Sequence, residues 1–163
     1  SVRYRGLKNM RHSCVTPSRT RQPVHFRDMS MFRFDGRPMM EVHHGGCLCG
    51  RVRLKASGKP DRVSICHCLD CRKHHGALFY AAAIFPKEAV EIEGESSDYA
   101  GRNFCPRCGS SVFARSGDEV EVHLGALDEP DRFRPTYECW TVRREGWLPA
   151  FPVDERFERE RDS

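Results

Sequence analysis

The stretch SICHCLDCRKHHGALF, residues 64–79, concentrates side chains that bind soft metal ions or act as nucleophiles. It holds three cysteines and three histidines within ten residues, and the chain then turns apolar. Thiolate and imidazole groups at this density are typical of a zinc site. The stretch alone leaves open whether four protein ligands close the site or one position stays available to a reacting molecule.

Two further pairs of cysteines lie outside this stretch, Cys47 with Cys49 and Cys105 with Cys108, each followed by a glycine. A tetrahedral zinc with Zn–S bonds of about 2.3 Å needs sulfurs roughly 3.8 Å apart, and a tight C-x-x-C turn supplies such a pair. The glycine relieves the crowding of that turn. We therefore expect these four residues, the four-cysteine cluster, to form a closed structural zinc site.

Cys66, Cys68 and Cys71 then remain as a three-cysteine cluster. Three protein ligands and an open position are the arrangement of a catalytic zinc, so we expect two Zn²⁺ per chain, the second one catalytic. Coordination deprotonates thiols, whose free pKa is about 8.5. A thiol substrate in the open position would become a nucleophile for a carbonyl compound held beside it.

The chain resembles the glutathione-dependent formaldehyde-activating enzyme family, also called the CENP-V/GFA domain. The resemblance covers about residues 42–151 and rests on GGCLCGRVRL, CHCLDCRK, FCPRCGSSVF and HLGALDEPDRFRPTYECWTVRREGWLP, in that order. It implies an Mss4-like β fold, with the four-cysteine cluster at the structural-zinc positions and the three-cysteine cluster at the catalytic-zinc positions. It also implies a carbon–sulfur lyase-type reaction, the formation of S-(hydroxymethyl)glutathione from glutathione and formaldehyde.

Basic side chains flank the clusters and could bind the carboxylates of glutathione through charge-assisted hydrogen bonds. These residues are Arg72, Lys73, Arg102 and Arg107. The alternative interpretation is that they are solvated surface residues or N–H donors to thiolates. The partner that this hypothesis predicts is a small-molecule thiol.

His74 and His75 follow CRK, where the family usually has a small residue and then Ser or Thr. A histidine here could close the second zinc site, could shape a pocket for a different thiol or aldehyde, or could face solvent. We expect His67 to point away from the metal and His123 to be an ordinary sheet residue. Cys139 is expected to be a small buried side chain, with a role as fourth ligand the remote alternative.

Short strands must position these side chains. Alternation and enrichment in β-branched and aromatic residues predict strands at residues 51–57, 78–85, 90–94, 110–116, 119–127 and 136–142. Helical signal is limited to a turn near residues 69–75 and to the charged segment 153–162. The sequence thus predicts a mainly β domain of short antiparallel strands stapled by zinc, with little helix.

Charge divides the chain. The net charge is +4, but residues 1–40 hold 9 Lys/Arg against 2 Asp/Glu, while residues 41–163 hold 18 against 21. Because the basic excess lies in the tail, we expect no nucleic-acid binding by the domain. We predict a disordered basic tail (1–40), a zinc domain (41–152) and a charged C-terminal tail (153–163). Upstream sequence is the favoured interpretation of residues 1–30, and an organellar leader the alternative.

The sequence also bears on the cellular compartment of the protein and on alternatives to an enzymatic function. The longest apolar run, residues 77–85, is far shorter than the ~20 residues of a membrane helix, and no secretory signal is recognisable. We expect a cytoplasmic protein without membrane contact, whose cysteines bind metal rather than pair as disulfides. The rivals to the enzyme are a non-catalytic two-zinc β module that binds a protein partner, and a thiol redox protein.

Overall fold

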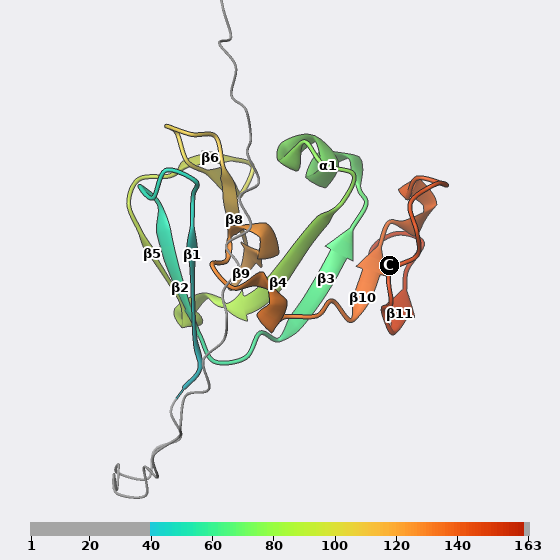
Figure 1. Cartoon of the computed structure of the whole chain (residues 1–163), viewed down its shortest axis with the longest axis horizontal. Helices are drawn as coiled ribbons and strands as arrows, with labels where there is room; N and C mark the ends of the chain where they lie inside the picture. Colours follow the sequence, from blue (N-terminus) through green and yellow to red (C-terminus); the bar gives the residue numbers. More distant parts are fainter. Residues whose placement is uncertain (1–39, 162–163) are drawn as a thin grey trace, which may run out of the picture. The chain divides into compact units, whose positions relative to one another are not determined.

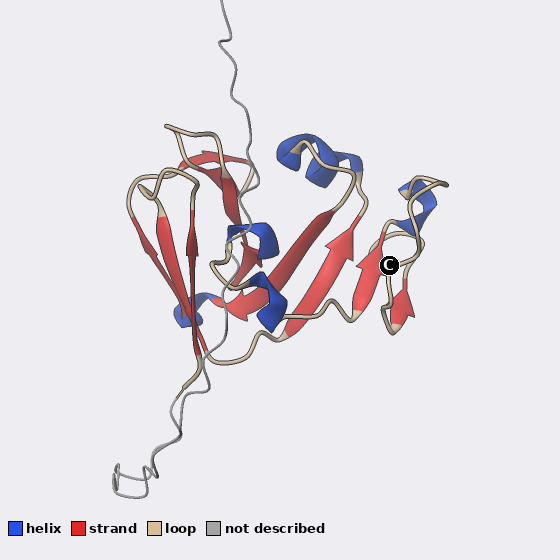
Figure 2. Cartoon of the chain, in the orientation of Figure 1, coloured by secondary structure: helices blue, strands red, loops and turns tan. Residues whose placement is uncertain are grey.

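The computed structural model of the chain describes residues 40–161, so the prediction of a disordered basic tail falls almost entirely outside the described residues. The described part contains eleven strands in two sheets, a single α-helix and four short 3₁₀ helices (Figure 1, Figure 2). The prediction of a mainly β fold with little helix is confirmed. No helix among these residues is long and apolar enough to cross a membrane.

The smaller sheet carries the first pair of cysteines. Its strands are antiparallel in the order β1-β2-β5 and are β1 (Val42–Gly46), β2 (Arg53–Ser57) and β5 (Val90–Glu93). Along β2, Leu54 and Ala56 are buried and the residues between them are partly exposed. This period of two is that of a strand with one face on a core. Cys47 and Cys49 lie in the turn between β1 and β2.

The larger sheet has the order β11-β10-β3-β4-β9-β8-β7-β6. Its strands are β3 (Arg62–Cys66), β4 (Tyr80–Pro86), β6 (Ser97–Tyr99), β7 (Arg102–Phe104), β8 (Ser111–Ser116), β9 (Glu119–His123), β10 (Tyr137–Cys139) and β11 (Glu155–Arg156). Strand β10 runs parallel to both β3 and β11, and the other pairs are antiparallel. The expectation of antiparallel strands therefore holds except around β10.

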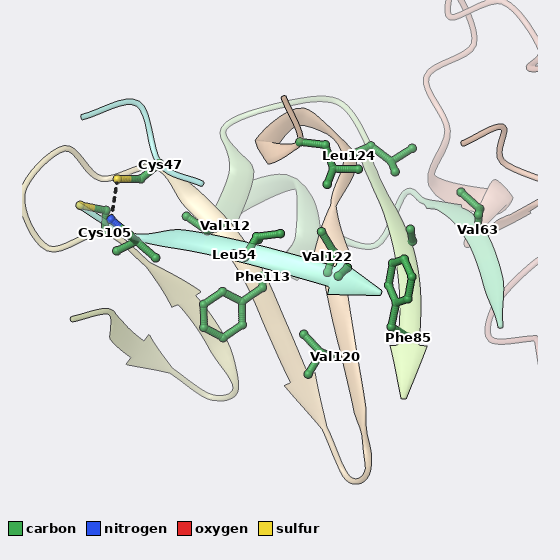
Figure 3. Close-up of a cluster of buried hydrophobic side chains, with 14 residues drawn as sticks. Cys47, Leu54, Val63, Phe85, Cys105, Val112, Phe113, Val120, Val122 and Leu124 are labelled. Carbon is green, nitrogen blue, oxygen red and sulfur yellow. Dashed lines mark hydrogen bonds between the residues drawn. The ribbon is translucent and has the colours of Figure 1, made fainter. Parts of the chain in front are cut away.

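The main core lies between the two sheets and draws its side chains from β2, β4, β8 and β9 (Figure 3). Phe85 and Phe113 are its largest fully buried side chains, and the four-cysteine cluster contributes the buried Cys47 and Cys105. Each large apolar side chain buried here stabilises the fold by about 1.5–3 kcal/mol. The four-cysteine cluster is thus continuous with the hydrophobic core.

Strand β4 separates this core from the three-cysteine cluster. Ala83 and Phe85 point into the core, whereas Tyr80, Ala82 and Ile84 form a second buried group on the opposite face. Cys66 and Cys71 pack against that second group. Because both faces of β4 are covered, its sequence is a continuous apolar run rather than an alternating one.

The helices are short. They are α1 (Leu69–His75) and the 3₁₀ helices η1 (Lys87–Ala89), η2 (Leu124–Ala126), η3 (Pro130–Arg132) and η4 (Thr141–Arg143). Helix α1 matches the turn predicted near residues 69–75, while the strand predicted at 119–127 ends at His123, where η2 begins. The helical signal at 153–162 is wrong: the segment contains β11, and Arg156 donates to the Glu138 carboxylate. The segment lacks an apolar stripe, so backbone pairing and this ion pair prevail over its helix propensity.

Candidate metal centres and the cavities beside them

The four-cysteine cluster brings together two turns that are distant in sequence. Its Sγ atoms all lie within 4.8 Å of one another. The Sγ of Cys49 is 3.6 Å from that of Cys47 and 3.7 Å from that of Cys105. These are the separations of thiolates around one tetrahedral zinc, roughly 3.8 Å. The donor set therefore fits a closed, thiophilic metal site, as the cysteine spacing predicted.

The two turns have the local geometry that such a site requires. Gly50 and Gly109, which follow the two pairs, have φ angles of 76° and 74°, in the left-handed region that favours glycine. The backbone N–H of Val52 donates to the Sγ of Cys47 over 3.2 Å. Backbone donors of this kind stabilise a thiolate.

Ser110 connects the two turns. Its hydroxyl accepts a hydrogen bond from the backbone N–H of Leu48 at 3.1 Å and lies 3.3 Å from the Sγ of Cys108. The hydrogen bond from Ser110 lowers the pKa of Cys108 to about 5. Sequence reasoning did not single out Ser110, although its place directly after C-x-x-C-G is a usable signal.

The three-cysteine cluster is built on the junction of β3 and α1. Cys66 ends β3, Cys68 is the N-cap of α1, and Cys71 lies in its first turn. Their Sγ atoms lie within 4.8 Å of one another, and no fourth Cys, His, Asp or Glu of residues 40–161 completes the group. The donor set fits a soft metal ion with one position left for another ligand.

Cys68, the N-cap of α1, is the most acidic thiol of the three. Its Sγ accepts a hydrogen bond from the backbone N–H of Cys71 at 3.3 Å, as an N-cap side chain does. Hydrogen bonds from the Cys66 and Cys71 thiols, the former contributing most, lower the pKa of Cys68 to about 2. Cys68 is therefore held as a thiolate, the form in which a cysteine binds a metal ion.

His67 points away from the sulfurs, as expected. It is fully buried, and its Nε2 lies 3.3 Å from Oε2 of the equally buried Glu138 on β10. The other carboxylate oxygen accepts a hydrogen bond from Nε of Arg156 at 3.0 Å. This buried chain anchors the residue between Cys66 and Cys68 to the neighbouring strands.

Neither His74 nor His75 joins the sulfur group. The Nε2 of His74 lies 2.7 Å from the hydroxyl of Ser111, and that hydroxyl lies 3.0 Å from Nδ1 of His123. His75 stacks on Tyr80 with a centroid separation of 4.7 Å and contacts the His123 ring. Of the three alternatives for these histidines, the structure supports the one in which they shape a pocket.

His123 is more than the ordinary sheet residue that the sequence indicated. It is 4% exposed, and Nδ1 has its partner in Ser111, but the buried Nε2 has no hydrogen-bond partner among the described residues. Burial, followed by the proximity of His75, lowers its pKa well below the usual value. The ring is therefore neutral at physiological pH.

Two cavities flank the three-cysteine cluster. One, of about 270 Å³, is lined by all three of its cysteines together with Cys139 and Trp140. The other, of about 240 Å³, is lined by Cys71 and by the histidines of α1 and β9. Four residues line both cavities: Cys71, Tyr80, Arg102 and Glu121. Cys139 lies opposite Cys66 in the backbone register of β10 and β3, but it is not part of the sulfur group.

The shared wall of the two cavities contains a strong hydrogen bond. The hydroxyl of Tyr80 donates to Oε2 of Glu121 over 2.6 Å. Burial, reinforced by this carboxylate, raises the pKa of Tyr80 well above its usual value. Tyr80 therefore keeps its proton, and its hydrogen bond holds the Glu121 side chain in place beside the cluster.

Some of the basic residues that flank the clusters are engaged in the fold, and others line the cavities. Arg72 donates to the carbonyl of Arg143 and pairs with Glu145, which occupies its guanidinium. Lys73 and Arg107 line neither cavity beside the three-cysteine cluster. Arg102 lines both cavities. Arg115, which sequence reasoning missed, lines the smaller one and lies over the Phe113 ring at 5.2 Å.

The fold and the two sulfur clusters define a mainly β protein with two candidate thiolate metal centres, one closed and one with an open position. A family model described as glutathione-dependent formaldehyde-activating enzyme matches residues 42–143. This match covers more than half of the chain, and the chain belongs to that family.

A curated relative is the uncharacterized lyase C29B12.13 of Schizosaccharomyces pombe. It is 35% identical to this chain over 79 residues, which are 45% of this chain and 58% of the relative. The match thus spans less than two thirds of the relative's length.

Proposed function

We propose that the chain is a lyase-type enzyme that forms or cleaves a thiol–aldehyde adduct, with glutathione and formaldehyde as substrates. In the forward direction the S–C bond of S-(hydroxymethyl)glutathione forms and the thiol proton ends on the new hydroxyl. No further reactant is needed. The family and the lyase named among its relatives support this class of reaction.

The observation that carries the proposal is the incomplete donor set of the three-cysteine cluster. Cys66, Cys68 and Cys71 supply three sulfurs within 4.8 Å and lack a fourth ligand among residues 40–161. The same three residues line a cavity of about 270 Å³. When bound here, zinc would lower the pKa of a substrate thiol enough to make it a nucleophile at neutral pH.

The protein's own groups would bind and orient the substrates. Arg102 and Arg115 line the cavity beside Cys71, and glutathione carries two carboxylates. Arg102 donates to the Ala100 carbonyl at 3.3 Å and lies 3.7 Å from Asp70, and its five N–H donors leave capacity for a further carboxylate. Tyr80 and Glu121 form the wall against which a bound adduct would lie.

The test compares metal content and thiol response in the full chain. We expect two zinc ions in the wild type, one in Cys68→Ala and two in the matched variant Cys139→Ala, which lies outside the sulfur group. In cobalt-substituted protein, glutathione should shift the absorption bands, whereas S-methylglutathione, which has no thiol, should not. Formation of the adduct from glutathione and formaldehyde should then exceed the uncatalysed rate.

A cobalt spectrum that is indifferent to glutathione in a protein with two metals would overturn the proposal. The second site would then be closed, and the non-catalytic module that binds a protein partner would be the better account. Reversible loss of metal with disulfide formation under mild oxidation would instead favour the redox protein.

A further inference from the structure

His75 lines both the cavity beside Cys71 and a larger cavity. It is the last residue of α1 and is half-buried. It lines the 240 Å³ cavity together with Cys71, and it also lines a cavity of about 610 Å³ that reaches Arg53 and Asp128. Among the described residues, Tyr80 and His123 are the other two that line both. A ligand that binds at Cys71 and fills the 240 Å³ cavity would lie beside this ring.

The ring nitrogens of His75 are available. Neither makes a hydrogen bond or ion pair to any residue that the structure describes. In contrast, Nε2 of His74 and Nδ1 of His123 both contact the Ser111 hydroxyl. Burial, followed by the charges of His74 and Arg102, lowers the pKa of His75 to about 4. The neutral ring offers one N–H donor and one acceptor nitrogen.

The ring is also held in a defined orientation. It stacks on Tyr80 at 4.7 Å with an interplanar angle of 27°, and it meets the His123 ring at 4.5 Å and 67°. The His74 ring closes a third side at 5.1 Å and 85°. Ser111, between His74 and His123, fixes two of these three neighbours. A ring held by packing and left without hydrogen-bond partners is preorganised for a ligand.

We propose that His75 is a catalytic residue that hydrogen-bonds the oxygen of the carbonyl substrate, and of the hydroxyl which that oxygen becomes. This role rests on the proposed function. As the S–C bond forms, the N–H of the neutral ring donates a hydrogen bond to the carbonyl oxygen, on which negative charge develops. The proton that the thiol loses ends on that oxygen, so protons and electrons balance and His75 stays neutral throughout.

Three variants of the full chain separate this role from packing. His75→Phe keeps the ring on Tyr80 but removes both nitrogens, and His75→Gln keeps a donor and an acceptor. His44→Phe changes an exposed histidine of β1 as the matched control. We expect His75→Phe to lower kcat about 10- to 100-fold with little change in the KM for glutathione. His75→Gln should recover part of the loss, and His44→Phe should match the wild type.

Two thioether ligands test the same contact without turnover. S-(2-hydroxyethyl)glutathione and S-propylglutathione have similar shapes, but only the first has a hydroxyl. We expect the wild type to bind the hydroxyl ligand about 3- to 10-fold more tightly than the propyl ligand. His75→Phe should bind both equally. If wild type makes no adduct but keeps this preference, the proposed function fails and the hydrogen-bonding role of His75 stands.

Two results would overturn the inference. The first is that wild type and His75→Phe show the same ratio of affinities for the hydroxyl and propyl ligands, because His75 would then make no contact with the oxygen. The second is a cobalt spectrum of the ligand-free protein that changes in His75→Phe but not in His44→Phe. That change would make His75 a metal ligand instead of a partner of the substrate.

Discussion

Glu138 is a buried carboxylate whose replacement tests how the three-cysteine cluster is held. Its side chain is fully buried, with one oxygen 3.3 Å from Nε2 of His67 and the other 3.0 Å from Nε of Arg156. His67 lies between Cys66 and Cys68, so the carboxylate anchors the segment that presents both sulfurs. We expect Glu138→Ala to destabilise the fold and to weaken metal binding at this cluster selectively.

The expected loss of stability depends on which of the two hydrogen-bond partners of Glu138 can bind water instead. The Arg156 side chain is 45% exposed and can replace the lost hydrogen bond with solvent, whereas His67 is 0% exposed and cannot. A buried ring left without its hydrogen-bond partner costs about 1–3 kcal/mol. We expect a loss of about 1–3 kcal/mol for Glu138→Ala. Glu138→Gln, which keeps one acceptor, should lose less.

The assay is urea unfolding of the metal-loaded chain, together with zinc release to a chromophoric chelator. One of the two metal ions should be released at least about 10-fold more readily from Glu138→Ala, and the ion of the four-cysteine cluster should be unaffected. Glu91→Gln, which breaks the exposed pair with Lys55, is the control and should change stability by at most about 1 kcal/mol. The reasoning is refuted if Glu138→Ala is as stable as this control, or if both metal ions are weakened equally.

Three further predictions concern the core and the effects of pH. Phe85→Ala should lower the free energy of unfolding by about 3–5 kcal/mol in urea, because Phe85 is fully buried between the sheets; a smaller loss than 1 kcal/mol would contradict that packing. Arg62 holds the pKa of Glu119 below its usual value of 4.5, so this pair stabilises the fold above about pH 4.5 and its contribution is lost at lower pH. In Glu119→Gln that part of the acid dependence should be missing from unfolding curves measured between about pH 5 and about pH 3. Burial lowers the pKa values of His75 and His123, so the unfolded chain binds protons that the folded chain does not, and stability should fall as pH drops from about 6.5 toward 4. His123→Asn should flatten this dependence, and an unchanged slope would show that the ring is not kept neutral by burial.

Sequence spacing predicted the metal donors because their geometry is local. The C-x-x-C-G turn and the C-x-C-x-x-C run place sulfurs close together through a few backbone angles, as the φ of Gly109 and the N-cap position of Cys68 show. The need for four ligands in a closed site then decided which pairs combine. Strands such as β2 were predictable for the same reason, since their alternation repeats every two residues.

Contacts across the sheet could not be predicted in this way. Ser111 meets His74 and His123 only because β8 pairs with β9 and α1 lies beside them, and no local pattern marks a serine that bridges two histidines. Nothing in the sequence TYECW marks Glu138 as buried, yet the parallel pairing of β10 with β3 buries it against His67. Arg115 likewise reaches a cavity through the register of β8.

The sequence by itself therefore determined the kind of protein: a mainly β chain with one closed and one incomplete set of cysteine ligands. Only the tertiary structure decided what surrounds the incomplete set. It directs His75 into the cavities and away from the sulfurs, and it gives Arg72 a structural partner while leaving Arg102 at the cavity wall. The physical reason is that ligand spacing depends on bonds and turns within a few residues, whereas cavity walls depend on which distant strands pair and in which register.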